Sequence, residues 1–131
     1  MLIVDAANVV GSCPNGWWRD RAGAARRLHS RVSAAARAGL LEPPVVVVLE
    51  GAARAGVAEG HADGVQVVHA TGEGDDTIAA AAAAAGEPVT VISADRALAE
   101  RVRRVGGDVV GPRWLLDVLD QLPSAPGEEK A

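Results

Sequence analysis

The chain has 131 residues, of which 49% are hydrophobic, and a formal net charge of -4. This composition predicts a single globular domain and excludes a disordered chain, and no apolar run is long enough to cross a membrane. The single cysteine, Cys13, excludes an internal disulfide, and one cysteine with three scattered histidines argues against structural zinc. Because nothing resembles a signal peptide, we expect a cytoplasmic protein without a membrane partner.

The first half of the chain predicts two buried strands separated by a helix. Residues 2–4 are an apolar run that ends at Asp5, and residues 9–16 contain the turn signals of a loop. A helix is expected over residues 18–38, where apolar side chains recur at helical spacing. Residues 45–49 are all valine or leucine and end at Glu50, which is typical of a central strand. The Gly- and Ala-rich residues 51–64 predict a short helix with loops.

The second half continues the alternation of strands and helices. Strands are expected at residues 65–68, 89–92 and 108–110, and helices open at Asp75, after Asp95 and at Pro112. The middle helix of these three is expected to bury Leu98, Val102 and Val105. Strands that alternate with helices form a parallel sheet with right-handed crossovers. We therefore predict a three-layer α/β domain over residues 1–122 with about five strands, followed by a flexible tail at 123–131.

Five acidic residues fall where predicted strands end or the next helices begin: Asp5, Glu50, Asp75, Asp76 and Asp95. The carboxyl ends of parallel strands lie along one edge, where doubly wound folds bind ligands. Helix capping is the alternative for the aspartates at helix starts, and Glu50 is alternatively a surface charge. Gathered carboxylates repel one another unless a cation lies among them, and oxygen ligands favour Mg²⁺ or Mn²⁺. Such an ion activates water and stabilises phosphoryl charge.

Three short motifs occur in the order and at the spacing of a known family. They are Asp5-Ala-Ala-Asn8 after the first strand, Gly74-Asp-Asp-Thr-Ile78 at a helix start, and Ser93-Ala-Asp-Arg96 after a later strand. The sequence thereby resembles the PIN-like nucleases, most closely the NYN-domain branch and within it the bacterial YacP-like proteins. The resemblance implies a PIN-like (Rossmann-like) fold and a metal-dependent ribonuclease. It covers the chain from residue 1 to about residue 119.

The resemblance assigns roles to individual residues. Asp5 corresponds to the metal ligand of the first strand, and Asn8 to the polar residue that orients metal, water or phosphate. The expected catalytic residues are Asp5, Asn8, Asp75 and Asp95, and the expected metal ligands are Asp5, Glu50, Asp75, Asp76 and Asp95. Ala6 and Ala7 depart from the Gly and the aromatic residue that relatives often carry. These departures concern the range of substrates more than metal binding.

Candidate RNA contacts flank the acidic positions. Trp17 and Trp18 are interpreted as a stacking surface for an unpaired base, with packing against the sheet as the alternative. Arg19, Arg21 and Arg96 are candidates for contacts to phosphate, and solvated helix faces are the alternative.

Three questions stay open at the level of sequence. A non-catalytic RNA- or ribosome-binding module with the same fold is the alternative function. A toxin of a toxin–antitoxin pair would share the fold as well. A chain of this length could use a dimer or another partner to complete a groove for single-stranded RNA.

Overall fold

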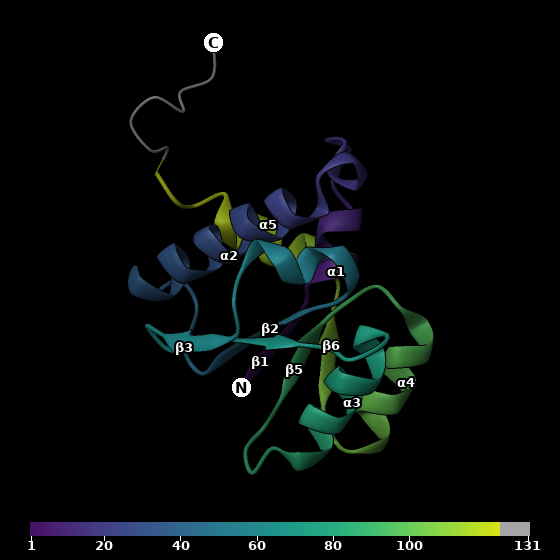
Figure 1. The fold of residues 1–131 in the computed structure, drawn as a ribbon. Helices are drawn as coiled ribbons and strands as arrows, with labels where there is room; N and C mark the ends of the chain where they lie inside the picture. Colours follow the sequence, from purple (N-terminus) through teal and green to yellow (C-terminus); the bar gives the residue numbers. More distant parts are fainter. Residues whose placement is uncertain (124–131) are drawn as a thin grey trace.

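A six-stranded sheet forms the centre of the protein in the computed structural model, which describes residues 1–123 (Figure 1). Its strands are β1 (Leu2–Asp5), β2 (Val45–Leu49), β3 (Gly60–Ala62), β4 (Val65–His69), β5 (Thr90–Ile92) and β6 (Asp108–Val110). Their order is β3-β4-β2-β1-β5-β6, and only β3 runs antiparallel to its neighbour. The predicted three-layer, mostly parallel α/β fold is therefore confirmed, with one more strand than expected.

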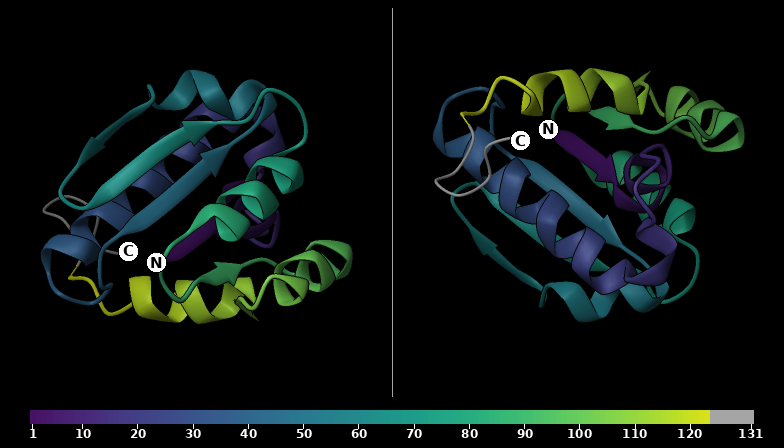
Figure 2. Two further views of the ribbon diagram at one scale, coloured as in Figure 1. Left: turned by 90° about the horizontal axis from the view of Figure 1, so that it is seen from below. Right: turned by 90° about the horizontal axis from the view of Figure 1, so that it is seen from above.

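Helices cover both faces of this sheet. The helices α1 (Ala6–Gly11), α2 (Arg21–Arg37) and α5 (Pro112–Leu119) lie on one face, and α3 (Gly74–Ala84) and α4 (Arg96–Arg104) lie on the other (Figure 2). Two short 3-10 helices, η1 (Trp17–Arg19) and η2 (Gly51–Gly56), flank α2. None of the helices within residues 1–123 combines the length and the apolar character that crossing a membrane requires.

The central strands are apolar on both faces because each face packs against a helical layer. In β1, Leu2 and Val4 join the core beneath α2 and α5, whereas Ile3 joins the core beneath α3 and α4. Val45 to Leu49 alternate in the same way, as the two-residue period of a strand requires. The alanines of α3 allow that helix to lie close to the sheet, where Ile78 and Ala82 are buried.

Four local expectations were wrong. A short helix, α1, extends to Gly11 and so enters the loop that was expected over residues 9–16, and the helix predicted from residue 18 is split into η1 and α2. β3 lies within residues 51–64 and pairs with β4 through a tight turn in which Asp63 (φ 56°) and Gly64 (φ 78°) both have positive φ. Val105 is exposed because α4 ends at Arg104. The predicted tail lies outside the described residues, apart from Pro123.

The strand order places a topological switch point between β1 and β5. From β1 the chain crosses to β2 on one side of the sheet centre, and later it returns through α3 to β5 on the other side. Crevices at such points, beyond the carboxyl ends of the strands, are the usual ligand sites of doubly wound folds. Asp5 ends β1 and Ser93 follows β5, so both residues lie at this point.

Candidate functional site

Asp5 is held at the end of β1 by two hydrogen-bond donors. The Ser93 hydroxyl donates to Asp5 Oδ2 at 2.8 Å, and the backbone N–H of Asn8 donates to Asp5 Oδ1 at 3.3 Å. The second contact makes Asp5 the N-cap of α1. Asp5 therefore has a structural role as a helix cap that the sequence did not predict, and this role uses only one of its two carboxylate oxygens.

The surroundings of Asp5 make its ionised form costly. Burial is the main reason that the pKa of Asp5 lies above its usual value, and the charges of Glu50 and Asp95 raise it further. The hydrogen bonds from Ser93 and Asn8 act in the opposite direction without cancelling the effect. A carboxylate in this position is stabilised by a nearby cation.

The loop after β5 is tied to α1 by hydrogen bonds. Asn8 Oδ1 accepts the backbone N–H of Ala94 at 2.7 Å, and Ser93 Oγ accepts the N–H of Asp95 at 3.1 Å. Asp95 Oδ1 accepts the N–H of Leu98 at 3.1 Å and so caps α4. These contacts fix the side chains of Asn8 and Asp95 at the switch point, and they leave the amide NH₂ of Asn8 as its remaining donor.

Glu50 reaches across to the start of α3. Its Oε2 accepts the backbone N–H of Gly74, the first residue of that helix. A side chain at position 74 would crowd this contact, because a Cβ there would lie 3.0 Å from Glu50 Oε2. Gly74 therefore lets the carboxylate after β2 and the acidic start of α3 approach each other.

The two neighbouring aspartates of α3 differ in their surroundings. Asp75 Oδ1 is buried without a hydrogen-bond partner in residues 1–123, while Asp75 Oδ2 lies 3.7 Å from Arg101 Nη1. Asp76 has a 78% exposed side chain and pairs with the same nitrogen at 2.8 Å. The N-cap of α3 is Glu73, which makes no side-chain capping bond, so capping does not account for Asp75. Asp76 is thus paired with Arg101 and does not lie among the other acidic side chains at this edge of the sheet.

The remaining acids line one hollow of about 340 Å³, here called the acid hollow. Its lining residues are Asp5, Ala7, Asn8, Glu50, Glu73, Asp75 and Asp95. In the described part of the chain, no three Asp, Glu, His or Cys side chains converge closely enough to enclose a metal ion. Mg²⁺ commonly keeps several waters and uses only one or two carboxylates. The carboxylate-rich lining and the Asp75 oxygen that has no partner within residues 1–123 thus fit a hydrated hard cation, and not a closed protein cage.

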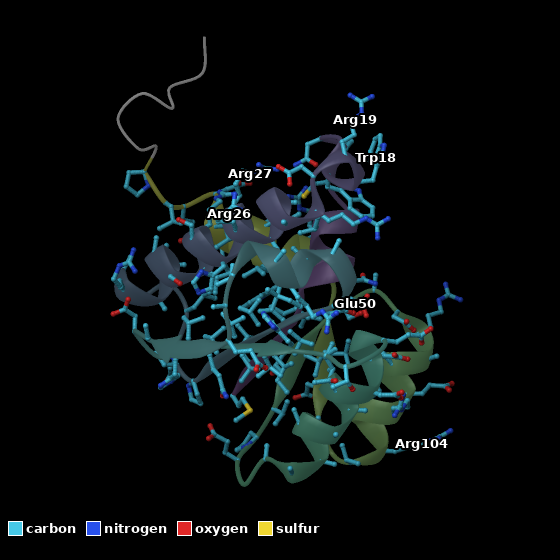
Figure 3. The ribbon with its side chains drawn as sticks, viewed as in Figure 1. Trp18, Arg19, Arg26, Arg27, Glu50 and Arg104 are labelled. Carbon is cyan, nitrogen blue, oxygen red and sulfur yellow. The ribbon has the colours of Figure 1, made fainter. Side chains whose placement is uncertain are left out.

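None of the predicted RNA contacts lines the acid hollow. Trp18 is 55% exposed and pairs with the Arg19 guanidinium, which lies 5.7 Å from its ring centroid. Figure 3 shows both side chains projecting from the segment before α2, away from Glu50. Trp17 instead lines a hollow next to the acids, and Arg96 is exposed at the start of α4, beside Asp95.

Two residues at or beside the acid hollow had no role assigned from the sequence. Ser93, which contacts Asp5, was noted only as part of a motif, and Glu73 became recognisable only through its position in the fold. The signal for Ser93 was its place directly after a strand, next to a predicted ligand. No sequence signal distinguished Asp75 from Asp76, because the difference is one of burial, and only Asp75 lines the hollow.

The fold as a whole is shared with a solved structure, although no family model and no curated protein matches the sequence. The class defined by the fold is a three-layer α/β domain with a mostly parallel sheet. The crystal structure of Rae1 (YacP) from Bacillus subtilis, a W164L mutant, superposes with a TM-score of 0.62 and is 20% identical. The superposition covers 91% of this chain and 73% of the other. YacP is also the name of the branch that the sequence motifs resemble.

Proposed function

We propose that this protein is a metal-dependent ribonuclease that hydrolyses RNA phosphodiester bonds at the acid hollow. The observation that carries the proposal is the meeting of carboxylates from separate chain segments at the switch point, where one oxygen of Asp75 is buried without a partner among the described residues. The resemblance of the motifs to PIN-like nucleases supports the choice of RNA as the substrate.

Each residue of the hollow has a chemical role in this proposal. Asp5 and Asp75 are the main holders of Mg²⁺ or Mn²⁺, and Glu50 and Asp95 contribute charge or bind through water. Bound in this hollow, the cation would lower the pKa of a water molecule and neutralise phosphate charge. The NH₂ group of Asn8 is free to donate to a phosphate oxygen. Asp76 is left out of the ligand set because its exposed side chain does not line the hollow.

The test is cleavage of end-labelled single-stranded RNA with Mn²⁺ and with chelator. We expect cutting that requires Mn²⁺ and falls about a thousandfold or more in Asp5→Asn, because metal assistance is worth several kcal/mol. Asp117→Asn is the matched control, since it removes an exposed carboxylate on α5 that pairs with Arg113. Equal cutting by wild type and Asp5→Asn would refute the proposal, as would silent wild type that binds no Mn²⁺ in calorimetry.

A second candidate is a non-catalytic RNA-binding module. It is favoured by the failure of any three acidic side chains of the described residues to converge on one point. RNA binding that is unaffected by metal or chelator, without cleavage, would support this candidate over the nuclease.

A further inference from the structure

A second hollow of about 390 Å³ adjoins the acid hollow, and we call it the Trp17 hollow. It is lined by Ala6, Ala7, Val10, Trp17, Arg21, Ala25, Glu50, Gly51, Ala53, Gly72 and Glu73. Three of these residues, Ala7, Glu50 and Glu73, line the acid hollow as well. The two hollows therefore share a wall, and one ligand can occupy both. The volume lies in the range of roughly 300–1,000 Å³ that is typical of ligand pockets.

The lining of the Trp17 hollow favours a flat, largely apolar group. Most of the surface comes from small apolar side chains and the half-buried ring of Trp17. The Arg21 guanidinium lies 5.2 Å from the centroid of that ring, so a planar cation packs over the aromatic ring, and both groups line the hollow. Glu50 and Glu73 at the shared wall repel a phosphate group. A neutral aromatic ring fits this combination, and an anion does not.

We propose that the Trp17 hollow binds one unpaired nucleobase of an RNA strand whose adjacent phosphate lies at the acid hollow. The inference rests on the proposed function, because the phosphate in the acid hollow is what places a base next to it. Bases of single strands stack on aromatic rings and on arginine planes. A base inside a duplex is stacked and paired, so it must leave the helix before it can enter such a pocket. The substrate class is thus single-stranded RNA. The Trp17 hollow, and not the acid hollow, excludes duplex RNA, because only an unpaired base can enter it.

The neighbouring tryptophan provides a matched control. Trp18 contacts Trp17 edge-on, with ring centroids 6.1 Å apart, but it does not line the hollow. Its exposed ring would serve a general stacking surface equally well. If the hollow holds the base, Trp17 matters and Trp18 does not.

The test measures binding of a fluorescently labelled six-nucleotide RNA by anisotropy. All proteins carry Asp5→Asn, so that the strand is not cut and one negative charge is removed. Trp17→Ala should weaken binding about tenfold, as expected for the loss of one base–aromatic stack. Trp18→Ala should change it less than about twofold, because rings outside the pocket contribute little. Trp17→Phe, which keeps an aromatic face, should retain most of the affinity and shows that the hollow is still folded.

A series of abasic strands identifies the bound base. Removing the base at one position should weaken binding by the Trp17 protein about tenfold and by Trp17→Ala hardly at all, because the interaction is already lost. Equal losses in Trp17→Ala and Trp18→Ala, or abasic losses that do not depend on Trp17, would overturn the inference. The proposed function is tested separately, and it fails if the wild-type protein does not cleave RNA in the presence of Mn²⁺. The binding assay described here does not depend on cleavage.

Discussion

The acid hollow and the Trp17 hollow lie side by side at one edge of the sheet, share three residues and have opposite linings. The first is built from carboxylates at strand ends and helix starts, and the second from small apolar side chains, Trp17 and Arg21. Under the proposed function, the difference assigns two tasks to this edge of the sheet. The carboxylates at the switch point would serve metal and phosphate, and the apolar surface from α1, η1 and η2 would serve a base.

The largest expected effect within the acid hollow distinguishes two neighbouring aspartates. Asp75→Asn should weaken Mn²⁺ binding by more than about tenfold, since loss even of supporting groups around a metal costs 10–100-fold. Asp76→Asn should leave the affinity within about twofold, because Asp76 is exposed and pairs with Arg101. Calorimetric titration of both variants with Mn²⁺ measures the contrast. Equal losses would place Asp76 among the ligands, as the sequence predicted.

Removing a carboxylate from the acid hollow should leave RNA binding by the Trp17 hollow intact. Asp75→Asn should bind the six-nucleotide RNA at least as tightly as wild type in the presence of chelator, because one phosphate-repelling charge has been removed. Trp17→Ala should in turn keep wild-type affinity for Mn²⁺ in calorimetry. Loss of Mn²⁺ binding in Trp17→Ala would show that the two hollows are one cooperative unit.

A smaller effect is expected from Ser93, which touches Asp5 but not the Trp17 hollow. Ser93→Ala removes the hydroxyl that stabilises ionised Asp5, so the pKa of Asp5 should rise further. Protons then compete more strongly with metal, and the pH dependence of cleavage should move to higher pH with about a tenfold loss at neutral pH. Ser33→Ala, which removes a hydroxyl in contact with His29 on α2, is the control. A lower rate without a shift of the pH profile would contradict this role.

The smallest expected effect is on the thermal stability of the metal-free protein. Because burial raises the pKa of Asp5, the folded state binds the proton of Asp5 more tightly than the unfolded state does. The stability contributed by this proton is fully present below the unfolded pKa of about 4 and is lost as pH rises through the raised folded pKa. In chelator, Asp5→Asn should therefore melt above wild type at neutral pH, and the difference should shrink on acidification. A higher melting temperature for wild type than for Asp5→Asn at neutral pH would contradict this. It would show that the hydrogen bonds from Ser93 and Asn8 stabilise ionised Asp5 by more than burial destabilises it.

The sequence predicted the parts of the fold that depend on local pattern. Residues 45–49 could only be a buried strand, and their run matches β2. β3 was missed because Gly60, His61 and Ala62 are all exposed and carry no alternation, although the Asp63-Gly64 pair that follows is a strong hairpin signal. α1 was missed because it has only six residues and no amphipathic period.

In the candidate site too, the features that follow from local sequence pattern were predicted, and those that depend on distant contacts were not. Asp5, Glu50, Asp75 and Asp95 were predicted to meet because parallel strands bring their carboxyl ends to one edge, and they do line one hollow. The separation of Asp75 from Asp76, the hydroxyl of Ser93 and the pairing of Trp17 with Arg21 depend on contacts between distant elements. Such contacts leave no period or spacing in the sequence.

Anomalous diffraction from crystals soaked in Mn²⁺ tests the central claim most directly. The account predicts a manganese peak in the acid hollow, with oxygens of Asp5 and Asp75 among its nearest protein atoms and water completing the shell. The peak should be absent from crystals of Asp5→Asn grown and soaked in the same way. No peak in the hollow at saturating Mn²⁺, or a peak only at surface carboxylates such as Asp117, would contradict the account.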